Sequence, residues 1–484
     1  MGQQHGAGPT PSVLERMAEL VAAVDEEALP PEIIREAGRR LLDALGCMLG
    51  GSDSGPARSV VAAVGADSGP VTIVGHSQRS DIAGGALANS TALRFLDYMD
   101  GHPGPYPCHP CFVVPAMLAA AESVDATGLA LARAITLGYE IDIRMQLASG
   151  DPDITARGWS GSTNLAFAVP AGAAGLLGLD QKALAHALAI STVHGPVLDA
   201  TGRGQMAASK ACVDGLVTHT ALTAVQLARH GLQGKLTAFE GPDGFLAGVA
   251  RKYDEDVLLA PVTRFRILDV YTKQYNAVKC AQSAVGSALR LRPQLTDWSE
   301  VAQVTLRLCE RDWRNQSSDS AARRRPGNRD TANHSVVYCL AAALVQGALR
   351  AEQFDEGHLA DPRIRAVIDL TEIEPDAELT SYWPAANPAS VELRTHSGRT
   401  LCDTTVHFPG HPANPVSDAD LEEKFRSLAE PRIGPDRASA VAALTRDLAG
   451  LTSVRDLTRL IAAPAETTAA PRRASRAPQP ATPG

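Results

Sequence analysis

Apolar residues recur at helical spacing through most of the first half of the chain. Residues three and four positions apart share one face of a helix, so this pattern predicts amphipathic helices. Gly, Pro or short polar breaks separate the segments, and each segment has about the length of a globular helix. The predicted helices cover residues 11–24, 31–50, 82–98, 112–124, 127–149, 164–177, 180–193 and 210–231.

From about residue 259 the pattern changes to an alternation rich in β-branched residues, which is typical of strands. Predicted strands occur in ILDVYTKQY (267–275), VAQVTLRLC (301–309), RAVIDLTEI (365–373) and ASVELRTHSGRTL (389–401). The last of these reaches a turn signal at residues 396–399, which predicts a hairpin. Helical patterns at 277–291 and 332–351 lie among the strands, so the sequence predicts a smaller α/β unit over residues 265–405.

Helical patterning returns after this unit. Ser417, followed three residues later by Asp420, predicts a helix N-terminus ahead of an amphipathic run, and helices continue to about residue 462. Residues 463–484 are rich in Pro, Ala and Thr and lack large apolar side chains, which predicts a disordered tail. The predicted fold is therefore mainly α. A large all-helical domain, made of residues 1–264 and 406–462, contains an inserted smaller α/β lid domain, residues 265–405.

Composition supports a helical protein and excludes several functional classes. Hydrophobic residues make up 45% of the 484 residues but aromatic residues only 4%, and abundant alanine favours closely packed helices. The net charge is −9 and the Lys and Arg residues are scattered, which argues against a nucleic-acid partner. The N-terminus lacks the basic and apolar regions of a secretory signal, and no apolar run reaches the roughly 20 residues of a membrane span. We expect a cytoplasmic protein with no membrane partner, whose eight cysteines are mostly buried and reduced.

The segment GHPGPYPCHPC, residues 101–111, is the most unusual stretch of the chain. A structural zinc site would need four ligands, and no second C-x-x-C or His pair occurs elsewhere. A c-type haem needs C-x-x-C-H, whereas the histidine here lies inside the cysteine pair. A thioredoxin-like redox pair expects a βαβ context, whereas this segment precedes an apolar helix. We therefore predict no metal site here.

What remains is a proline-stiffened loop that carries Asp97, Asp100, His102 and His109. A carboxylate near an imidazole is an acid/base arrangement, because the carboxylate can fix the tautomer and raise the basicity of the ring. The alternative is structural, with Asp97 as a capping residue and His109 as a hydrogen-bonded histidine at a helix entrance. Residue types alone leave both readings open.

Six motifs in order along the chain resemble the MmgE/PrpD family, which includes dehydratases, decarboxylases and epimerases of small carboxylates. The family reads Asn, LDFDD, a variable loop and HPS; this chain has Asn89, LDYMD at 96–100 and HPC at 109–111. The other five motifs are LLDALGCMLGG (41–51), GLLGLDQKALAHALAIS (175–191), LARHGLQGKLTAFEGPDGF (227–245), ANHSVVYCLAAALVQG (332–347) and PANPVSDADLEEKF (412–425).

The resemblance implies a helical main domain with a smaller α/β lid, an active site between them, a homodimer and no metal or organic cofactor. It also implies a reaction that removes or replaces a group beside a carboxylate by proton transfer at carbon. Asp97 matches the first acid of LDFDD, and His109 matches the histidine of HPS. Lys210 lies 21 residues before Gly231, as the family's active-site lysine does. These matches make Asp97, His109 and Lys210 the candidate catalytic residues.

Departures from the family pattern fall at histidine positions. Where the family often reads G-[FW]-H-x-T, Ser160 follows Trp159 here. In the lid, the histidine position of FPAEFHAQTA is Cys280, and the neighbouring histidine position of the decarboxylases is Val278. Neither serine nor valine transfers a proton near neutral pH as imidazole does. Substitutes for the missing imidazoles could come from Lys279, Cys280 or Tyr275.

The lid also carries the basic stretch RRRPGNRDTANHS, residues 323–335. Arginine suits carboxylates, so Arg323, Arg324, Arg325 or Arg329 could hold an anionic substrate, although a solvated basic loop is the commoner meaning of such a run. His334 matches a family histidine, but Asn333 replaces the aspartate before it. The candidate substrate-binding residues are Trp159, Ser160, Tyr275, Lys279, Cys280, Arg325, Arg329 and His334.

The sequence therefore predicts a cofactor-independent lyase, a dehydratase or decarboxylase, that acts on a small carboxylate of a specialised pathway. In this hypothesis His109 or Lys210 moves the proton, Asp97 orients His109, and the lid excludes water. Because family histidines are missing, we expect a substrate other than 2-methylcitrate or cis-aconitate. Two alternatives remain open: an epimerase or isomerase of the same fold, and a non-catalytic homologue with a binding role.

Overall fold

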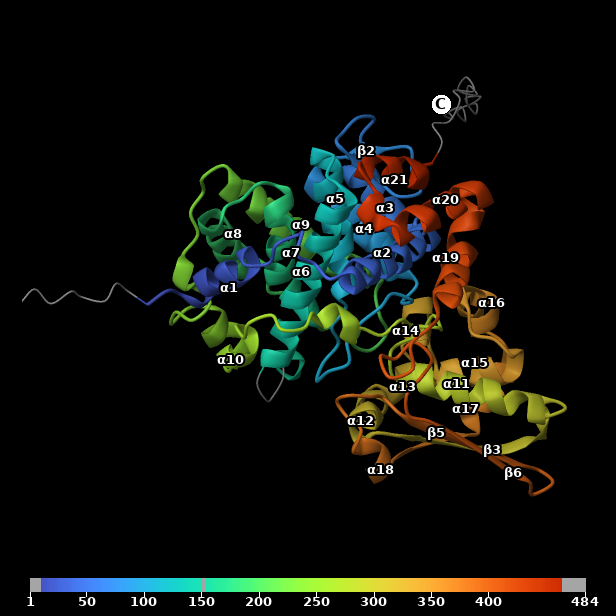
Figure 1. The fold of residues 1–484 in the computed structure, drawn as a ribbon. Coiled ribbons are helices and arrows are strands. Elements are labelled where there is room, and N and C mark those ends of the chain that lie inside the picture. The colour runs from blue at the N-terminus through green and yellow to red at the C-terminus, as the bar shows by residue number, and fades with distance from the viewer. Residues whose placement is uncertain (1–9, 150–153, 464–484) are drawn as a thin grey trace, which may run out of the picture.

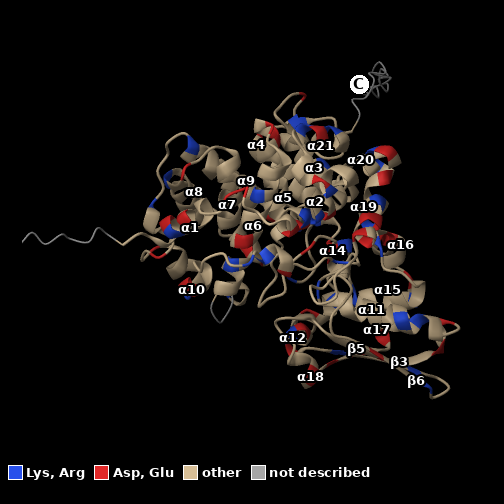
Figure 2. Ribbon diagram, in the orientation of Figure 1, with Lys and Arg blue, Asp and Glu red and all other residues tan. Residues whose placement is uncertain are grey.

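The structure is a computed structural model that describes residues 10–149 and 154–463. It confirms the predicted mainly α fold with a smaller α/β part (Figure 1). Within the described residues, no helix combines the length and apolar character needed to cross a bilayer. Figure 2 shows acidic and basic residues interspersed along both parts. The predicted disordered tail lies outside the described residues from residue 464 onward.

In the part of the chain that the structure describes, the helical unit has ten α-helices before the α/β part and three after it. They are α1 (Val13–Ala22), α2 (Pro31–Gly51), α3 (Gly55–Val64), α4 (Ile82–Phe95), α5 (Val113–Val124), α6 (Gly128–Ala148), α7 (Leu165–Leu176), α8 (Gln181–His194), α9 (Val213–Arg229), α10 (Glu255–Leu258), α19 (Asp418–Ile433), α20 (Pro435–Arg446) and α21 (Val454–Ile461). A short hairpin of β1 (Val71–Thr72) and β2 (Arg79–Ser80), which the sequence analysis missed together with α3, lies beside α4 and α5. Alanine-rich faces let α4, α5, α7 and α9 pack closely in one core.

The α/β unit is built on a four-stranded sheet in the order β4-β3-β5-β6. Its elements are α11 (Ala281–Leu291), β3 (Val301–Leu308), α12 (Glu310–Ser318), α13 (Ser320–Arg324), α14 (Arg329–Asn333), α15 (Val336–Gln346), α16 (Glu356–Leu359), α17 (Pro362–Asp369), β4 (Thr371–Pro375), α18 (Ala377–Thr380), β5 (Ala389–Thr395) and β6 (Thr400–Thr405). β3 pairs parallel with β4 and antiparallel with β5, and β5 and β6 form the predicted hairpin. Helices α11 and α15 cover one face of the sheet (Figure 1).

Two separate hydrophobic cores underlie the two units. One joins side chains between Val13 and Val270 with side chains between Leu421 and Ile461. The other joins side chains between Ala277 and Leu401. Ile267 and Val270 lie within the expected inserted domain 265–405 but pack in the first core. We propose that the inserted domain begins between Val270 and Ala277 and ends near residue 405, and that residues 406–462 return to the first domain.

Two predicted strands are wrong in whole or in part. Residues 267–275 form no sheet strand: a 3₁₀ turn (Arg266–Asp269) is followed by an extended segment. Its Tyr271 exchanges both backbone hydrogen bonds with Gly101, so the segment pairs with the loop of GHPGPYPCHPC instead of the sheet. Residues 365–369 belong to helix α17, which Asp361 caps and a proline begins, and only 371–375 form a strand.

A buried lysine of the returning helix α19 holds together two loops that are far apart in sequence. Lys424 pairs with Asp43 at 2.7 Å and donates to the carbonyl oxygens of Tyr98 and Lys273 at 2.8 and 2.9 Å. These carbonyls belong to segments far apart in sequence, residues 96–112 and 271–280. The returning helix therefore fixes the relative position of the two segments that carry most of the site.

Ser417→Ala should destabilise the start of α19. The Ser417 hydroxyl accepts from the Asp420 N–H at 3.1 Å, and the Ser417 N–H donates to the Asp420 carboxylate at 3.3 Å, which forms a capping box at the predicted helix start. Loss of this cap should cost about 0.5–2 kcal/mol, seen as a lower Tm. Ser427→Ala on the same helix, where Ser427 caps nothing, is the control. Equal Tm shifts in both variants would contradict the role of the cap.

Candidate active site

Asp97 lies immediately after α4, in a backbone conformation with φ of 48°. Asp and Asn tolerate this left-handed region better than other residues with a Cβ. The Asp97 N–H donates to the Arg94 carbonyl at 3.1 Å, which closes the last turn of the helix. The turn directs the carboxylate into a buried cavity between the two units.

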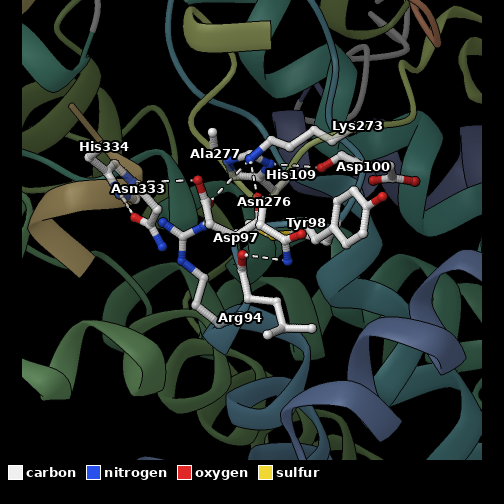
Figure 3. Close-up of polar contacts among 12 residues, drawn as sticks. Arg94, Asp97, Tyr98, Asp100, His109, Lys273, Asn276, Ala277, Asn333 and His334 are labelled. Atoms are coloured by element: carbon white, nitrogen blue, oxygen red, sulfur yellow. Dashed lines mark hydrogen bonds and ion pairs between the residues drawn. The ribbon is translucent and has the colours of Figure 1, made fainter. Parts of the chain in front are cut away.

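Three basic side chains surround the Asp97 carboxylate (Figure 3). Arg94 Nη1 lies 2.8 Å from Oδ1, Lys273 Nζ lies 3.2 Å from Oδ1, and His334 Nε2 lies 3.9 Å from Oδ2. Lys273 also donates to the Asp97 carbonyl at 2.9 Å. Burial alone would raise the pKa of Asp97, but these neighbours and Lys210 hold it well below its usual range. Asp97 is therefore an ionised anchor for cations and is a poor proton acceptor near neutral pH.

His109 is oriented by the backbone and not by Asp97, which corrects the prediction for that pair. Its Nδ1 lies 2.8 Å from the carbonyl oxygen of Asp100. A carbonyl oxygen only accepts, so Nδ1 carries the proton and Nε2 is left with a lone pair. Burial, Lys273 and Arg94 lower the pKa of His109 well below its usual value, so the ring is neutral.

Lys210 and His334 form a contact between the two units. Lys210 precedes α9 in a short 3₁₀ helix (Ala208–Cys212), and His334 follows α14. Lys210 Nζ lies 2.6 Å from His334 Nε2, while His334 Nδ1 donates to the Asp330 carbonyl at 2.9 Å and to Asn333 Oδ1. The asparagine that replaces the family aspartate thus still orients this imidazole.

Burial and the charge of Arg94 lower the pKa of Lys210 to about 7, although Asp97 and Asp330 act in the opposite direction. Burial and Lys210 also lower the pKa of His334 well below its usual value. The imidazole is therefore a neutral acceptor for an N–H of Lys210. A lysine with a pKa near 7 exists in both protonation states at neutral pH, which suits general acid/base work.

The cavity brings together many of the predicted residues but not all. Among the candidates, its lining includes Asp97, His109, Ser160, Lys210, Lys279, Cys280, Arg323 and His334, and also the replaced position Val278. Five candidates are absent from the lining, and one of them, Arg324, donates to the carbonyl oxygens of Ile368 and Thr371. Trp159 packs on the helical core and Tyr275 on the α/β core. Arg325 pairs with Asp369 at the surface, and Arg329 lies 4.8 Å from the Phe95 ring centroid.

The cavity lining also contains residues that the sequence analysis missed. The most important are Arg94, Lys273, Asp142 and Asp214. Arg94 stands three positions before Asp97, a spacing at which helical side chains meet, and this could have suggested the pair. Lys273 carried no such signal, because its segment resembled a strand. Seven of the lining residues are Lys or Arg and five are Asp, so the cavity favours anions.

The cysteines of GHPGPYPCHPC are buried free thiols. Cys108 donates to Asp142 Oδ2 at 3.2 Å, and Cys111 faces the Asp100 carbonyl at 3.8 Å. Asp100 itself accepts from the Tyr139 hydroxyl at 2.7 Å, and His102 Nδ1 lies 2.6 Å from Gln146 Oε1. Across residues 10–149 and 154–463, no group of three or more His, Cys, Asp or Glu side chains is arranged to hold a metal ion.

Arg323 and Arg325 are expected to differ sharply in their effect on substrate binding. Arg323 is buried at the cavity and donates to the His334 carbonyl, whereas Arg325 pairs with Asp369 in solvent. Arg323→Ala should raise KM about tenfold or more for an acid that the enzyme converts, because a charged donor is lost. Arg325→Ala is the matched control and should leave KM unchanged. The reverse order of effects in steady-state kinetics would contradict this placement.

The fold and the cavity define an acid/base site enclosed by a helical unit and an α/β unit. The chain belongs to the MmgE/PrpD family: the model of the MmgE/PrpD N-terminal domain matches residues 15–257, and that of the C-terminal domain matches residues 275–449. This confirms the resemblance found in the sequence.

Three curated relatives illustrate what the chain is similar to. It is 27% identical to cis-aconitate decarboxylase of Homo sapiens over 78% of this chain and 79% of the relative. It is 24% identical to the Mus musculus cis-aconitate decarboxylase over 94% of each chain. It is also 27% identical to 2-methylcitrate dehydratase of Cupriavidus necator over 57% of this chain and 59% of the relative.

Proposed function

We propose that this protein is a cofactor-independent lyase that eliminates water or carbon dioxide from a small carboxylate by acid/base proton transfer. The observation that carries the proposal is the buried Lys210, whose Nζ lies 2.6 Å from His334 Nε2 beside the ionised Asp97. Its relatives' names, decarboxylase and dehydratase, support the same reaction class.

Lys210 is the proton carrier in this proposal. In its neutral form the amine takes a proton from the carbon beside the substrate carboxylate, while His334 holds it in place through one hydrogen bond. Asp97 keeps Lys273 and Arg94 at the cavity wall, where their remaining N–H groups can stabilise the charge that develops on the carboxylate. His109 presents a neutral Nε2 that can accept a hydrogen bond from the substrate.

The α/β unit acts as a lid in this proposal. It supplies His334, Arg323, Lys279 and Cys280 to the cavity, so the site is complete only when the two units are together. Exclusion of water by the lid would strengthen the interactions of the buried charges. A homodimer and a cytoplasmic location remain proposals that follow from the family and from the sequence.

The substrate is proposed to differ from cis-aconitate and 2-methylcitrate. Ser160, Val278 and Cys280 line the cavity at the positions that the family patterns described above give as histidine, and in this proposal they change its shape and its hydrogen-bonding groups. Burial raises the pKa of the Cys280 thiol well above its usual value, so this cysteine is a poor replacement for an imidazole.

The test is to incubate the purified protein with hydroxylated and unsaturated di- and tricarboxylates and to follow products by NMR. Loss of water or carbon dioxide from at least one acid is the expected result. Inversion of a centre without change of mass would assign an epimerase instead. Silence from every acid, in a protein that is folded, would contradict a lyase and favour a binding role.

A further inference from the structure

A second carboxyl group, that of Asp142, lies in the wall of the same cavity and contrasts with Asp97. Asp142 is on α6 and is 2% exposed. Asp97 has Arg94 and Lys273 within ion-pair distance, whereas no Lys, Arg or His of the described residues lies within ion-pair distance of Asp142. Such a pair of carboxyls in opposite environments is a common basis for dividing acid and base roles.

The hydrogen bonds of Asp142 leave one oxygen free. Cys108 Sγ lies 3.2 Å from Oδ2, and burial raises the pKa of this thiol well above its usual value, so it stays protonated and donates. Oδ1 has no hydrogen-bond partner among the described residues. The carboxyl group therefore has one oxygen bound to a donor and a second oxygen that can carry a proton at the cavity.

The groups around Asp142 come from several elements and none neutralises a carboxylate. They are Cys108, Tyr106 and Asp100 from the loop before α5, Asp214 from α9 and Tyr253 from the segment before α10. Lys279 acts on Cys108 but its own main acidic neighbour is Asp312. Burial, with the charges of Asp214 and Asp100, raises the pKa of Asp142 to about 7 despite the Cys108 hydrogen bond.

We propose that Asp142 is the proton donor of this site, in place of the imidazole acid that Ser160 has replaced. The inference rests on the proposed lyase function. Ser160 lines the same cavity, and its hydroxyl lies 3.1 Å from that of Ser162, which in turn donates to Asp214.

The proton balance is simple for both eliminations. In a dehydration, Lys210 takes the C–H proton, the C–H electrons form the double bond, and the C–O bond breaks with its electrons on oxygen. That oxygen takes the Asp142 proton and leaves as water. In a decarboxylation, the C–C bond to the carboxylate breaks, carbon dioxide leaves, and the bond electrons remain on the carbon, which takes the Asp142 proton without removal of a C–H proton. In both reactions Asp142 is left ionised and regains a proton from solvent, and after a dehydration Lys210 releases the proton that it took.

Thermal stability against pH tests the protonation state of Asp142 without any substrate. An unfolded aspartate ionises above about pH 4, whereas the native Asp142 stays protonated to about pH 7. Its contribution to stability therefore falls as pH rises between these values and is constant above them. Asparagine does not ionise, so Asp142→Asn does not lose this stability. The Tm of the variant relative to that of the wild type should therefore increase from about pH 4 to 7. Asp142→Glu should keep the wild-type slope.

Asp97→Asn is the opposite control, because the pKa of Asp97 is lowered in the native state. Its Tm should fall behind the wild type only between the native pKa of Asp97 and about pH 4, and the gap should stay constant from pH 4 to 7. A Tm difference between Asp142→Asn and wild type that is constant or shrinks from pH 4 to 7 would overturn the inference. Asp142→Ser gives the same comparison should the amide variant not fold.

Kinetics on an acid that the enzyme converts test the donor role itself. Asp142→Asn should lower kcat about 10²–10⁴-fold and should abolish the fall in kcat above about pH 7 that Asp142 ionisation causes. If Asp142→Asn keeps the fall in kcat above about pH 7, or keeps the wild-type kcat, the inference is overturned and the lyase proposal stays intact. If none of the tested acids is converted, the result counts against the proposed function. The Tm comparison still tests the protonation state of Asp142 in that case.

Discussion

Lys210→Met is expected to lower kcat about 10³-fold or more without unfolding the protein. The proposed base is lost, and general base catalysis contributes roughly 10²–10⁴-fold. Methionine has a similar length and carries no charge into a buried site. Because the pKa of Lys210 is lowered in the native state, the wild type bears a cost for this lysine that is largest below about pH 7 and fades as pH rises toward the unfolded value. The variant should therefore match or exceed the wild-type Tm at pH 7.

Lys182→Met is the matched control for this variant, because Lys182 is exposed on α8 and lies outside the cavity lining. It should leave kcat and Tm unchanged. In the wild type, kcat/KM should rise with pH toward about 7, because the base must be neutral to accept a proton, and should fall above that pH as Asp142 ionises. A Lys210→Met enzyme with more than a tenth of wild-type kcat would rule out the proposed role of the amine.

Asp97→Asn is expected to cause the largest loss of stability, of about 3 kcal/mol or more, together with a loss of activity. Asparagine tolerates the left-handed backbone of residue 97, so the change mainly removes the charge. Lys273 would then be buried without its counter-ion, while Arg94 would keep only Asp214, and leaving one member of a buried pair unpaired typically costs about 3–5 kcal/mol. The measurement is the Tm and the denaturant midpoint.

The pH dependence gives the second signature of Asp97. Its native pKa lies well below the usual value, so its stabilisation is present above about pH 4 and is lost as pH falls through the native pKa. The gap between wild type and Asp97→Asn should shrink below that pH. Asp369→Asn, which breaks the exposed pair with Arg325, is the control and should cost at most about 1 kcal/mol. Similar losses of stability in the two variants would contradict a larger contribution from the buried Asp97 cluster than from the exposed pair.

The sequence predicted the elements that rest on local patterning. Long alternating or helical segments such as β3, the β5–β6 hairpin and α6 occur where the periodicity placed them. The capping box at Ser417 was predictable from two residues. The predicted sheet strand at 267–275 was wrong because this segment pairs with the loop at Gly101 and not with the sheet. Such a long-range contact cannot be read from the periodicity of the sequence.

Site residues that belong to a motif were predictable from the sequence. Residues that only the fold brings to the cavity were not. Asp97, His109, Lys210 and His334 were selected from motifs, and the structure places all four at one cavity. Which arginine of the run 323–325 faces inward depends on how α13 packs, and the run itself contains no such information. Asp142 was one polar position in a buried helix, and its unusual environment exists only after α6, α9 and the loop before α5 come together.

The most direct test of a Lys210-centred acid/base site is solvent hydrogen exchange in D2O, followed by NMR on an acid that the enzyme binds. The wild-type enzyme should introduce deuterium at the carbon beside a carboxylate, at a rate that rises with pH through about 7. Lys210→Met should show no exchange above the uncatalysed rate, and Lys182→Met should match the wild type. Equal exchange by wild type and Lys210→Met would contradict the proposal.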